Sequence, residues 1–360
     1  MNRERIIEEF VKQINIPSVS GNEEEFSQYL ETRLKDLGLS VEKDSFGNIF
    51  AILPGNTTGK KPVLFCAHMD TVPTDPVKYY IDGDKIKANG SQILGADDKA
   101  ATTALLEMLH SLKEEGVSHG DVEVLLTVQE EIGLIGAKNF DLGKARSQFF
   151  FVLDYSGPIG LAVYSAPFAN EFHFRFFGKA AHAGSEPEKG ISAIQALAMA
   201  ISNMPLGRID SETTANIGII SGGRATNIVA DFAEMKGEAR SRNPQKLEKQ
   251  TQLMLQAAEE AAISVGARVE IDCRREYEGY TLKEDDDIIL ILKEALSSIG
   301  SSLKLVAAGG ASDANVFNFK GRKSLVLSCG YEYPHTREEE VSISQMVDLS
   351  RLLKEIVLKA

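Results

Sequence analysis

Three predominantly apolar runs constrain the fold of this chain more than any other feature. They are Val63–Ala67, Val122–Val128 and Phe149–Leu153. Because these runs lack the polar alternation of a half-exposed strand, they are typical of strands that are covered on both faces. Segments with helical periodicity alternate with such strands along the chain. The pattern predicts an α/β fold with a mostly parallel or mixed sheet and helices on both faces.

The order of elements changes after residue 165, which predicts a second domain. Between residues 166 and 276 the pattern reads strand, helix, strand, strand, helix, strand, an α+β ferredoxin-like arrangement. The expected helices cover residues 188–203 and 243–264. The α/β pattern returns after Tyr280, so residues 1–165 and 277–360 are predicted to form one discontinuous domain and 166–276 an inserted one. Within the first domain, the segment from Thr71 to Gly95 is predicted to be mostly loop.

Composition excludes several classes of protein. The 360 residues carry a net charge of −13, which argues against a general affinity for nucleic acid or anionic membranes. Cys66, Cys273 and Cys329 are too few and too far apart for a disulfide framework, and free thiols favour a reducing compartment. The N-terminus is too charged for a signal peptide, and no apolar run approaches the length of a membrane span. A cytoplasmic protein is therefore predicted.

Histidines and acidic residues follow the apolar runs. His68 and Asp70 come after the first run, Glu130 and Glu131 after the second, and Asp154 after the third. In open α/β sheets, ligands bind outside the carboxyl ends of the strands, so these side chains are expected at one edge. Each has an ordinary explanation when taken alone, such as a solvated turn for the glutamates or a structural role for the histidine. Their coincidence favours a metal site.

Asp97 and Asp98 stand where a loop turns into the helix that follows, and His335 follows a later apolar strand. The aspartates could simply cap the helix and complement its dipole, and His335 could be an exposed loop residue. We instead predict that Asp97 bridges two metal ions. Two histidines, a shared aspartate, one glutamate and Asp154 are about the set that two ions need, and the other glutamate would be a general base. Nitrogen and oxygen donors without thiolate suit Zn²⁺, with Co²⁺ or Mn²⁺ as alternatives.

The same motifs resemble a known family. In order along the chain they are His68-Met69-Asp70-Thr71, Gly95-Ala96-Asp97-Asp98-Lys99, Glu130-Glu131, Asp154 and Pro334-His335-Thr336. They are similar to those of the dinuclear zinc exopeptidases and deacylases, a family that includes peptidase T, carboxypeptidase G and the aminoacylases. The resemblance covers nearly the whole chain and is greatest to peptidase T.

The resemblance implies a role for each residue of the site. It implies one ion on His68 and Asp154, a second on Glu131 and His335, and Asp97 between them. Glu130 would be the general base, and Asp70, already expected to orient His68, would complete the catalytic set. The peptide bond between Asp97 and Asp98 is expected to be cis, as in such enzymes.

For the inserted domain, the resemblance implies a lid and dimerisation role. His182, in Gly178-Lys179-Ala180-Ala181-His182, is similar to a lid histidine that polarises the scissile carbonyl, often from the neighbouring subunit. Asn227 and Arg240 match substrate-contacting positions, and Gly310 lies in a loop that approaches the substrate with its backbone. Ordinary alternatives are a solvated histidine, an exposed strand-end arginine and a helix cap after Gly310. A homodimer through this domain is expected.

The function implied is that of a metallo-exopeptidase that cleaves the N-terminal residue from short peptides, as a tripeptide aminopeptidase does. Metal-activated water would attack the peptide carbonyl with Glu130 as the base. A carboxypeptidase or an N-acyl-amino-acid deacylase would use the same chemistry on other substrates. A non-catalytic scaffold is a further alternative, but it would need no base at Glu130.

Overall fold

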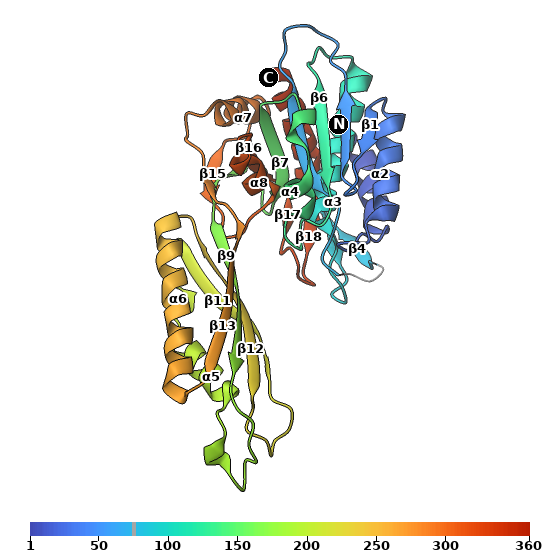
Figure 1. The fold of residues 1–360 in the computed structure, drawn as a ribbon. Coiled ribbons are helices and arrows are strands. Elements are labelled where there is room, and N and C mark those ends of the chain that lie inside the picture. The colour runs from blue at the N-terminus through green and yellow to red at the C-terminus, as the bar shows by residue number, and fades with distance from the viewer. Residues whose placement is uncertain (74–76) are drawn as a thin grey trace. The chain divides into compact units, whose positions relative to one another are not determined.

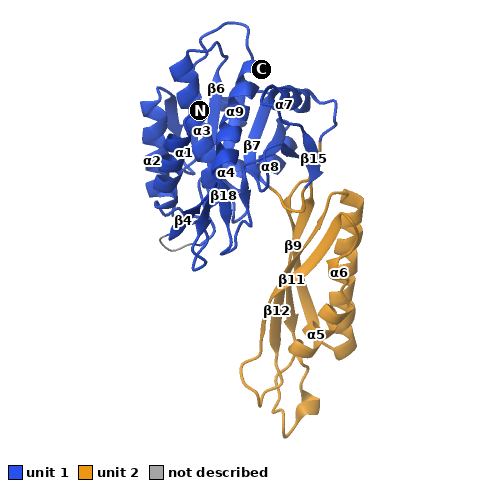
Figure 2. Ribbon diagram, turned by 180° about the vertical axis from the view of Figure 1, so that it is seen from behind, with its two compact units in different colours: residues 1–164, 282–307, 312–360 blue, residues 165–281, 308–311 orange. Residues whose placement is uncertain are grey.

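The computed structural model describes residues 1–73 and 77–360, and they form two compact units. Unit 1 takes residues 1–164, 282–307 and 312–360, and unit 2 takes residues 165–281 and 308–311 (Figure 2). Unit 2 is thus slightly larger than the inserted segment expected from the sequence. Hydrogen bonds explain the difference: Ala308 N donates to the carbonyl of Ser165, and β14 (Tyr280–Thr281) pairs with Ser165 and Ala166.

The sheet of unit 1 is mixed and has a parallel centre, which confirms the predicted fold class. Its central strands are β6 (Val122–Thr127), β3 (Val63–His68), β7 (Phe149–Tyr155) and β16 (Lys323–Ser328), adjacent in that order and parallel. The strands β1 (Ser40–Lys43) and β2 (Ile49–Leu53) extend it antiparallel beyond β6, and β8 (Leu161–Ala166) does so beyond β16. The short β15 (Lys304–Ala307) also pairs with β8. Both β3 and β6 are buried along their whole length, as their apolar runs predict.

Helices cover both faces of this sheet (Figure 1). On β7, Phe150 packs edge-on against Phe317 of α8, whereas the neighbouring Phe151 contacts Phe65 of β3. Helix α8 packs on β7 and β16, whereas α3 packs on β3 and β7 and is itself in contact with α1 and α9. The helices of unit 1 in the described ranges are α1 (Arg3–Ile14), α2 (Glu24–Asp36), α3 (Ala96–Glu115), α4 (Ile135–Asn139), η1 (Leu142–Lys144), α7 (Asp287–Ser298), α8 (Asp313–Phe319) and α9 (Ile343–Lys359).

The stretch between Thr71 and Gly95, predicted to be mostly loop, also contains two short strands. A hairpin of β4 (Tyr79–Asp82) and β5 (Lys85–Ala88) forms there, and it joins β17 (Tyr331–Glu332) and β18 (Glu340–Ser342) in a small antiparallel sheet. The hairpin is paired with strands about 250 residues away, for example Ile86 with Val341, and that partner is invisible in the local pattern. Residues 74–76 of the stretch lie outside the described residues.

Unit 2 has the predicted ferredoxin-like order of elements. Its sheet runs β10-β11-β12-β9-β13 and packs on two helices. The helix α5 begins at Ala193, later than expected, because residues 187–189 form a separate 3-10 turn and Ser192 caps α5. The elements are β9 (Phe168–Phe177), η2 (Pro187–Lys189), α5 (Ala193–Asn203), β10 (Gly207–Arg208), β11 (Thr213–Gly222), β12 (Phe232–Ser241), α6 (Pro244–Val265) and β13 (Arg268–Tyr277).

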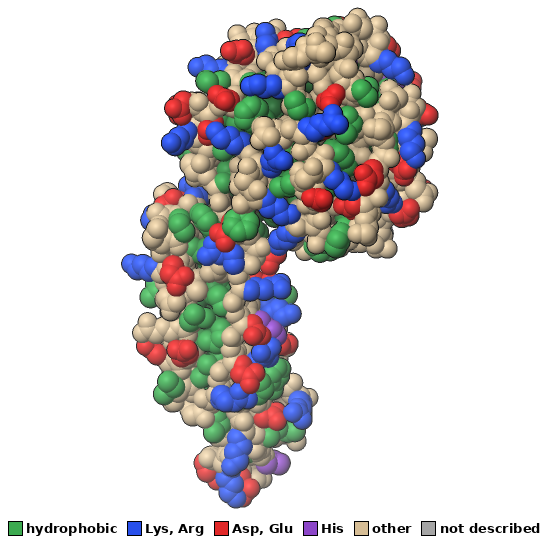
Figure 3. Space-filling model, turned by 45° about the horizontal axis from the view of Figure 1, so that its top comes forward, with side chains coloured by type: hydrophobic (Ala, Val, Ile, Leu, Met, Phe, Trp, Pro, Cys, Tyr) green, Lys and Arg blue, Asp and Glu red, His purple; other side chains and the backbone are tan. Residues whose placement is uncertain are grey.

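The two faces of the unit 2 sheet differ in chemistry. Phe172, Phe174 and Phe176 of β9 point into a core that α5 and α6 complete. The residues between them are polar and pair across strands, as Arg175 does with Asp272 of β13 at 2.9 Å. Figure 3 shows acidic and basic side chains interspersed over unit 2. Neutralising pairs of this kind suit a solvated sheet face.

The helices in the described part of the chain are too short or too polar to cross a bilayer. Within residues 1–73 and 77–360, no helix is both long and apolar enough to cross a membrane. The longest, α6, has 22 residues, but it carries Lys246, Glu248 and Lys249 in its first two turns. The cytoplasmic location expected from the sequence stays a prediction.

Candidate active site

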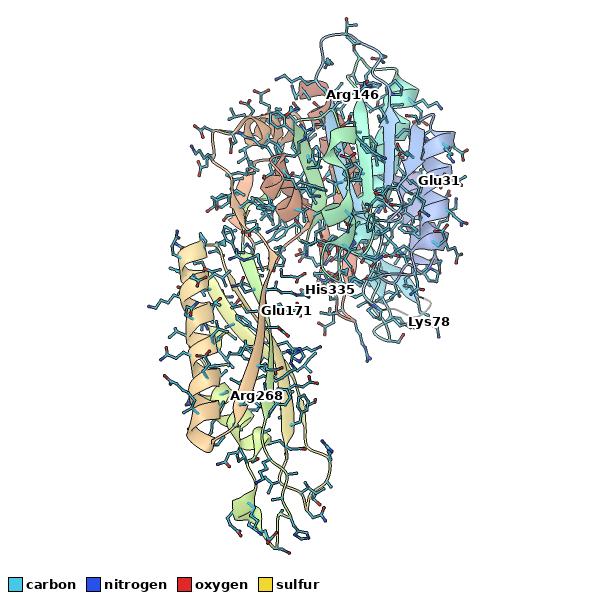
Figure 4. All side chains as sticks on the ribbon, in the orientation of Figure 1. Glu31, Lys78, Arg146, Glu171, Arg268 and His335 are labelled. Carbon is cyan, nitrogen blue, oxygen red and sulfur yellow. The ribbon has the colours of Figure 1, made fainter. Side chains whose placement is uncertain are left out.

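The predicted site residues of unit 1 gather at the carboxyl edge of its sheet. His68 is the last residue of β3, Asp154 lies at the end of β7, and Glu130 follows β6. Figure 4 shows His335 at this end of the sheet, opposite Arg146, which precedes β7. Since the central strands are parallel, their ends bring together residues that are far apart in the sequence.

Asp97 lies between the two histidines. Its Oδ1 is 3.2 Å from His68 Nε2, and its Oδ2 is 3.3 Å from His335 Nε2. On the outer sides, Asp154 Oδ1 is 3.8 Å from His68 Nε2, and Glu131 Oε1 is 2.8 Å from His335 Nε2. The Asp97–Asp98 peptide bond is cis, as expected. Each oxygen of one carboxylate therefore faces a different imidazole, and each imidazole has a further carboxylate beside it.

Two groups of side chains in the described ranges have ligand atoms close enough to hold a cation. One consists of His68, Asp97 and Glu131, the other of His68, Glu130 and Asp154, and within each group the atoms lie within 4.8 Å of one another. Imidazole nitrogen and carboxylate oxygen are a donor set that suits Zn²⁺, Co²⁺ or Mn²⁺. Glu130 is near enough to be a ligand itself. The geometry alone therefore does not decide whether Glu130 is a metal ligand or the general base.

The site holds more negative charge than its own side chains neutralise. Burial, and then the charge of Asp154, raise the pKa of Glu130 well above its usual value; burial and the charge of Asp97 do the same for Asp154. Asp98 is fully buried, and its Oδ1 has no hydrogen-bond partner in the described structure. Hydrogen bonds with Asp97 and Glu131 raise the pKa of His335 to about 10. Buried anions of this kind are stable when they hold a cation, so the cluster fits a pair of divalent metal ions.

Asp70 organises two parts of the cluster. His68 Nδ1 donates to the backbone carbonyl of Asp70 at 2.8 Å and lies 3.6 Å from its carboxylate, which leaves Nε2 for the site. The Asp70 carboxylate accepts the N–H groups of Glu130 at 2.9 Å and of Glu131 at 3.2 Å. Gln129, with a φ of 54°, turns the chain from β6 so that these groups face Asp70. The sequence predicted the contact with His68 but not the one with the glutamate pair.

Glu339 is a residue of this region that sequence reasoning missed. It is 1% exposed, and its carboxylate accepts the N–H groups of Gly95 at 2.8 Å and of Asp97 at 3.0 Å. It therefore ties the segment that carries His335 to the loop that presents Asp97. Glu339 stands in a run of three glutamates, from 338 to 340, which reads as a solvated surface, so no local signal marks it.

Replacing Glu339 by alanine is expected to lower the free energy of unfolding by about 1–3 kcal/mol, because two buried N–H groups would lose their acceptor. Urea denaturation in the presence of a chelator measures this without a contribution from bound metal. Glu338→Ala, at an exposed neighbouring position, is the matched control and should stay within about 0.5 kcal/mol of the wild type. Equal stability of the two variants would contradict the role of Glu339.

In unit 2, the structure brings His182 and Asn227 together. Both are exposed, and the segments that carry them pair through Ala183 N, which donates to the carbonyl of Asn227. His182 Nδ1 accepts the N–H groups of Gly184 at 3.2 Å and of Ser185 at 3.1 Å. A neutral imidazole that accepts at Nδ1 carries its proton on Nε2. The loop thus presents His182 as a hydrogen-bond donor.

Arg240 and Gly310 form a second pair in unit 2. A Cβ on Gly310 would lie 4.0 Å from Arg240 Nη1. Arg240 Nη2 donates to Glu238 at 2.8 Å, its guanidinium lies 6.0 Å from the ring centre of Tyr277, and its buried Nε has no hydrogen-bond partner in the described structure.

The two pairs lie at opposite ends of the unit 2 sheet. Arg240 is opposite Ala169, near the start of β9, and that strand covers roughly 26 Å, at ~3.3 Å per residue, from Ala169 to Phe177. Beyond Phe177 the pairing continues in the same direction to His182, through hydrogen bonds such as that from Val229 N to the carbonyl of Ala181. Figure 4 labels Glu171 and Arg268, which mark the two ends of this paired region.

Known proteins are similar to this chain over its whole length. Residues 64–359 match the model for peptidase family M20/M25/M40. The crystal structure of aminopeptidase PepT from Bacillus cereus ATCC 10987 is similar with a TM-score of 0.90 and 37% identity over 100% of this chain and 99% of that one. A tripeptidase from Staphylococcus aureus subsp. aureus Mu50 has a TM-score of 0.94 and 35% identity over 99% and 98%. The protein YqjE of Bacillus subtilis strain 168 is 41% identical in an alignment of 369 positions that covers 100% of this chain and 99% of that protein.

Proposed function

The chain belongs to peptidase family M20/M25/M40, and from that membership we propose that it is a dinuclear-metal aminopeptidase that removes the N-terminal residue from short peptides. Peptidase character follows from the family. The cleaved bond and the preference for tripeptides are the proposed part. They are supported by two similar structures, at 37% and 35% identity, whose names are an aminopeptidase and a tripeptidase.

The observation that carries the proposal is the position of Asp97, whose two oxygens face His68 and His335 separately. We assign His68 and Asp154 to one ion, Glu131 and His335 to the other, and Asp97 to both. Zn²⁺ is the proposed metal, with Co²⁺ or Mn²⁺ as alternatives. When bound, such ions supply Lewis acidity and lower the pKa of water.

The protein's own residues have distinct tasks in the proposed reaction. Glu130 accepts the proton of the attacking water and returns it to the leaving amine. Its backbone N–H donates to Asp70, which fixes the main chain from which this side chain extends. The Nε2–H of His182 donates to the carbonyl oxygen of the scissile peptide as negative charge develops there. Arg240 binds the substrate carboxylate, and Asn227 and the backbone at Gly310 complete the binding surface.

The layout of unit 2 supports a homodimer. His182 and Arg240 are separated by at least the roughly 26 Å between Ala169 and Phe177, which is longer than a tripeptide at ~3.3–3.6 Å per residue. One copy of unit 2 therefore cannot offer both side chains to the same short substrate. We propose that the chain dimerises through unit 2 and that each site takes its His182 from the partner subunit.

Metal removal and a substrate panel test the proposal. The protein is stripped with a chelator and reloaded with Zn²⁺, Co²⁺ or Mn²⁺. It is then incubated with free tripeptides, free dipeptides, N-acetylated amino acids and glutamate-terminated acyl substrates. Mass spectrometry identifies the broken bond. Stripped protein is expected to be inactive, and reloaded protein to release the N-terminal residue of tripeptides.

Other outcomes would select other functions. Cleavage of blocked substrates alone would assign the chain to deacylation, and release of the C-terminal residue would make it a carboxypeptidase. If protein that is shown to hold two ions cleaves no substrate of the panel, a non-catalytic scaffold would be favoured, because the metal site would be intact without hydrolysing a substrate.

A further inference from the structure

Tyr331 contacts the candidate site but has no part in the function proposed above. Its side chain is among the largest that are fully buried, with 1% exposure. The hydroxyl donates a hydrogen bond to Asp97 Oδ1 at 3.1 Å. The same oxygen lies 3.2 Å from His68 Nε2. The phenol is thus in direct contact with the carboxylate that is proposed to bridge two ions.

The backbone of Tyr331 is tied to the strand end that carries Asp154. Gly157 N donates to the carbonyl of Tyr331 at 2.8 Å, and Gly330 N donates to the carbonyl of Gly157 at 3.0 Å. On its other side Tyr331 pairs with Val341 of β18. Strand pairing and burial hold the ring in one place, so its hydroxyl is a fixed point against which Asp97 is oriented.

A carboxylate oxygen has two lone pairs, and the phenol occupies one of those on Asp97 Oδ1. The other remains for a cation on the His68 side, while Oδ2 faces His335. A phenol is protonated at neutral pH, so the hydroxyl is a donor and does not add to the negative charge of the cluster.

We propose that Tyr331 is a positioning residue that holds the Asp97 carboxylate in the orientation in which it can bridge two cations. The proposal rests on the dinuclear site proposed above. Loss of the hydroxyl would free the carboxylate to rotate about its side-chain bonds, and a cation would have to restore the orientation on binding. Contacts that orient metal ligands in this way typically account for 10–100-fold in metal affinity, as an order of magnitude.

The test compares Tyr331→Phe with a matched control, Tyr29→Phe. The Tyr29 hydroxyl donates to Glu9 Oε1 at 2.7 Å, so both variants lose one bond from a phenol to a carboxylate, but Glu9 is not a proposed ligand. Zn²⁺ affinity is measured by competition with a chromophoric chelator. Tyr331→Phe should bind Zn²⁺ about tenfold or more weakly than the wild type, and Tyr29→Phe should bind it unchanged.

A spectroscopic readout separates positioning from a merely structural role. The chain has nine tyrosines and no tryptophan, so tyrosine dominates its near-ultraviolet spectrum. Zn²⁺ binding should perturb the buried phenol on Asp97 and produce a tyrosine difference spectrum in the wild type and Tyr29→Phe. That signal should be lost in Tyr331→Phe, and melting of the metal-free variants checks that both are folded.

The outcomes distinguish this proposal from the one on which it rests. If the wild type binds two Zn²⁺ ions and Tyr331→Phe has the same affinity and difference spectrum, the role of Tyr331 is refuted while the dinuclear site stands. If the folded wild type binds no divalent cation, both proposals fail.

Discussion

Replacing Glu130 by glutamine is expected to lower kcat by about 10²–10⁴-fold, the contribution typical of a general base. Glutamine has nearly the same shape but cannot accept a proton at neutral pH. The N–H that residue 130 donates to Asp70 is retained, since it belongs to the backbone. The variant should therefore still bind two metal ions per subunit, which elemental analysis measures beside the steady-state rate.

The adjacent Glu131 provides the matched control. Its Oε1 lies 2.8 Å from His335 Nε2, and it is assigned as a ligand, so Glu131→Gln is expected to lose metal as well as activity. This comparison decides which glutamate is the ligand and which is the base. The geometry leaves that open, because both glutamates lie in groups that could hold a cation. Metal loss from Glu130→Gln, with metal retained in Glu131→Gln, would exchange the two roles.

Mixing two inactive variants is expected to restore activity. His182→Ala and Arg240→Ala should each be nearly inactive alone, because every site would lack one contact. If each site takes His182 from the partner, a mixed dimer has one site with both residues and one with neither. Random reassortment makes half of the dimers mixed, so about a quarter of wild-type turnover should return. The rate is measured after the variants are unfolded and refolded together.

The matched control mixes His182→Ala with the double variant His182→Ala/Arg240→Ala. No dimer in that mixture has a complete site, so its rate should stay at the background. Equal, low rates in both mixtures would show that each subunit supplies its own His182. That result would contradict the argument from the distance between His182 and Arg240 along β9. A fully active monomer in sedimentation would contradict the dimer directly.

Local patterns were sufficient for the framework of unit 1 and for the sheet edge at which the candidate ligands gather. The apolar runs that became β3, β6 and β7 have no polar alternation, and burial on both faces is what excludes it. Parallel strands end at a common edge of the sheet, so the sequence alone could predict that His68, Glu130 and Asp154 lie close together there. The ferredoxin-like order of unit 2 followed from the same kind of periodicity.

Contacts between distant segments were decided only by the tertiary structure. The pairing of β5 with β18, the hold of Glu339 on the Asp97 loop and the hydroxyl of Tyr331 on Asp97 each join residues more than 200 positions apart. Even Asp70, whose contact with His68 was expected, holds the two glutamates through backbone groups that carry no residue-specific signal. The sequence by itself determined which residues have the chemistry of metal ligands and on which strand ends they lie, because hydrophobic periodicity and residue type are local properties. The orientation of those ligands depends on hydrogen bonds made by the packed chain, and only the folded structure decided it.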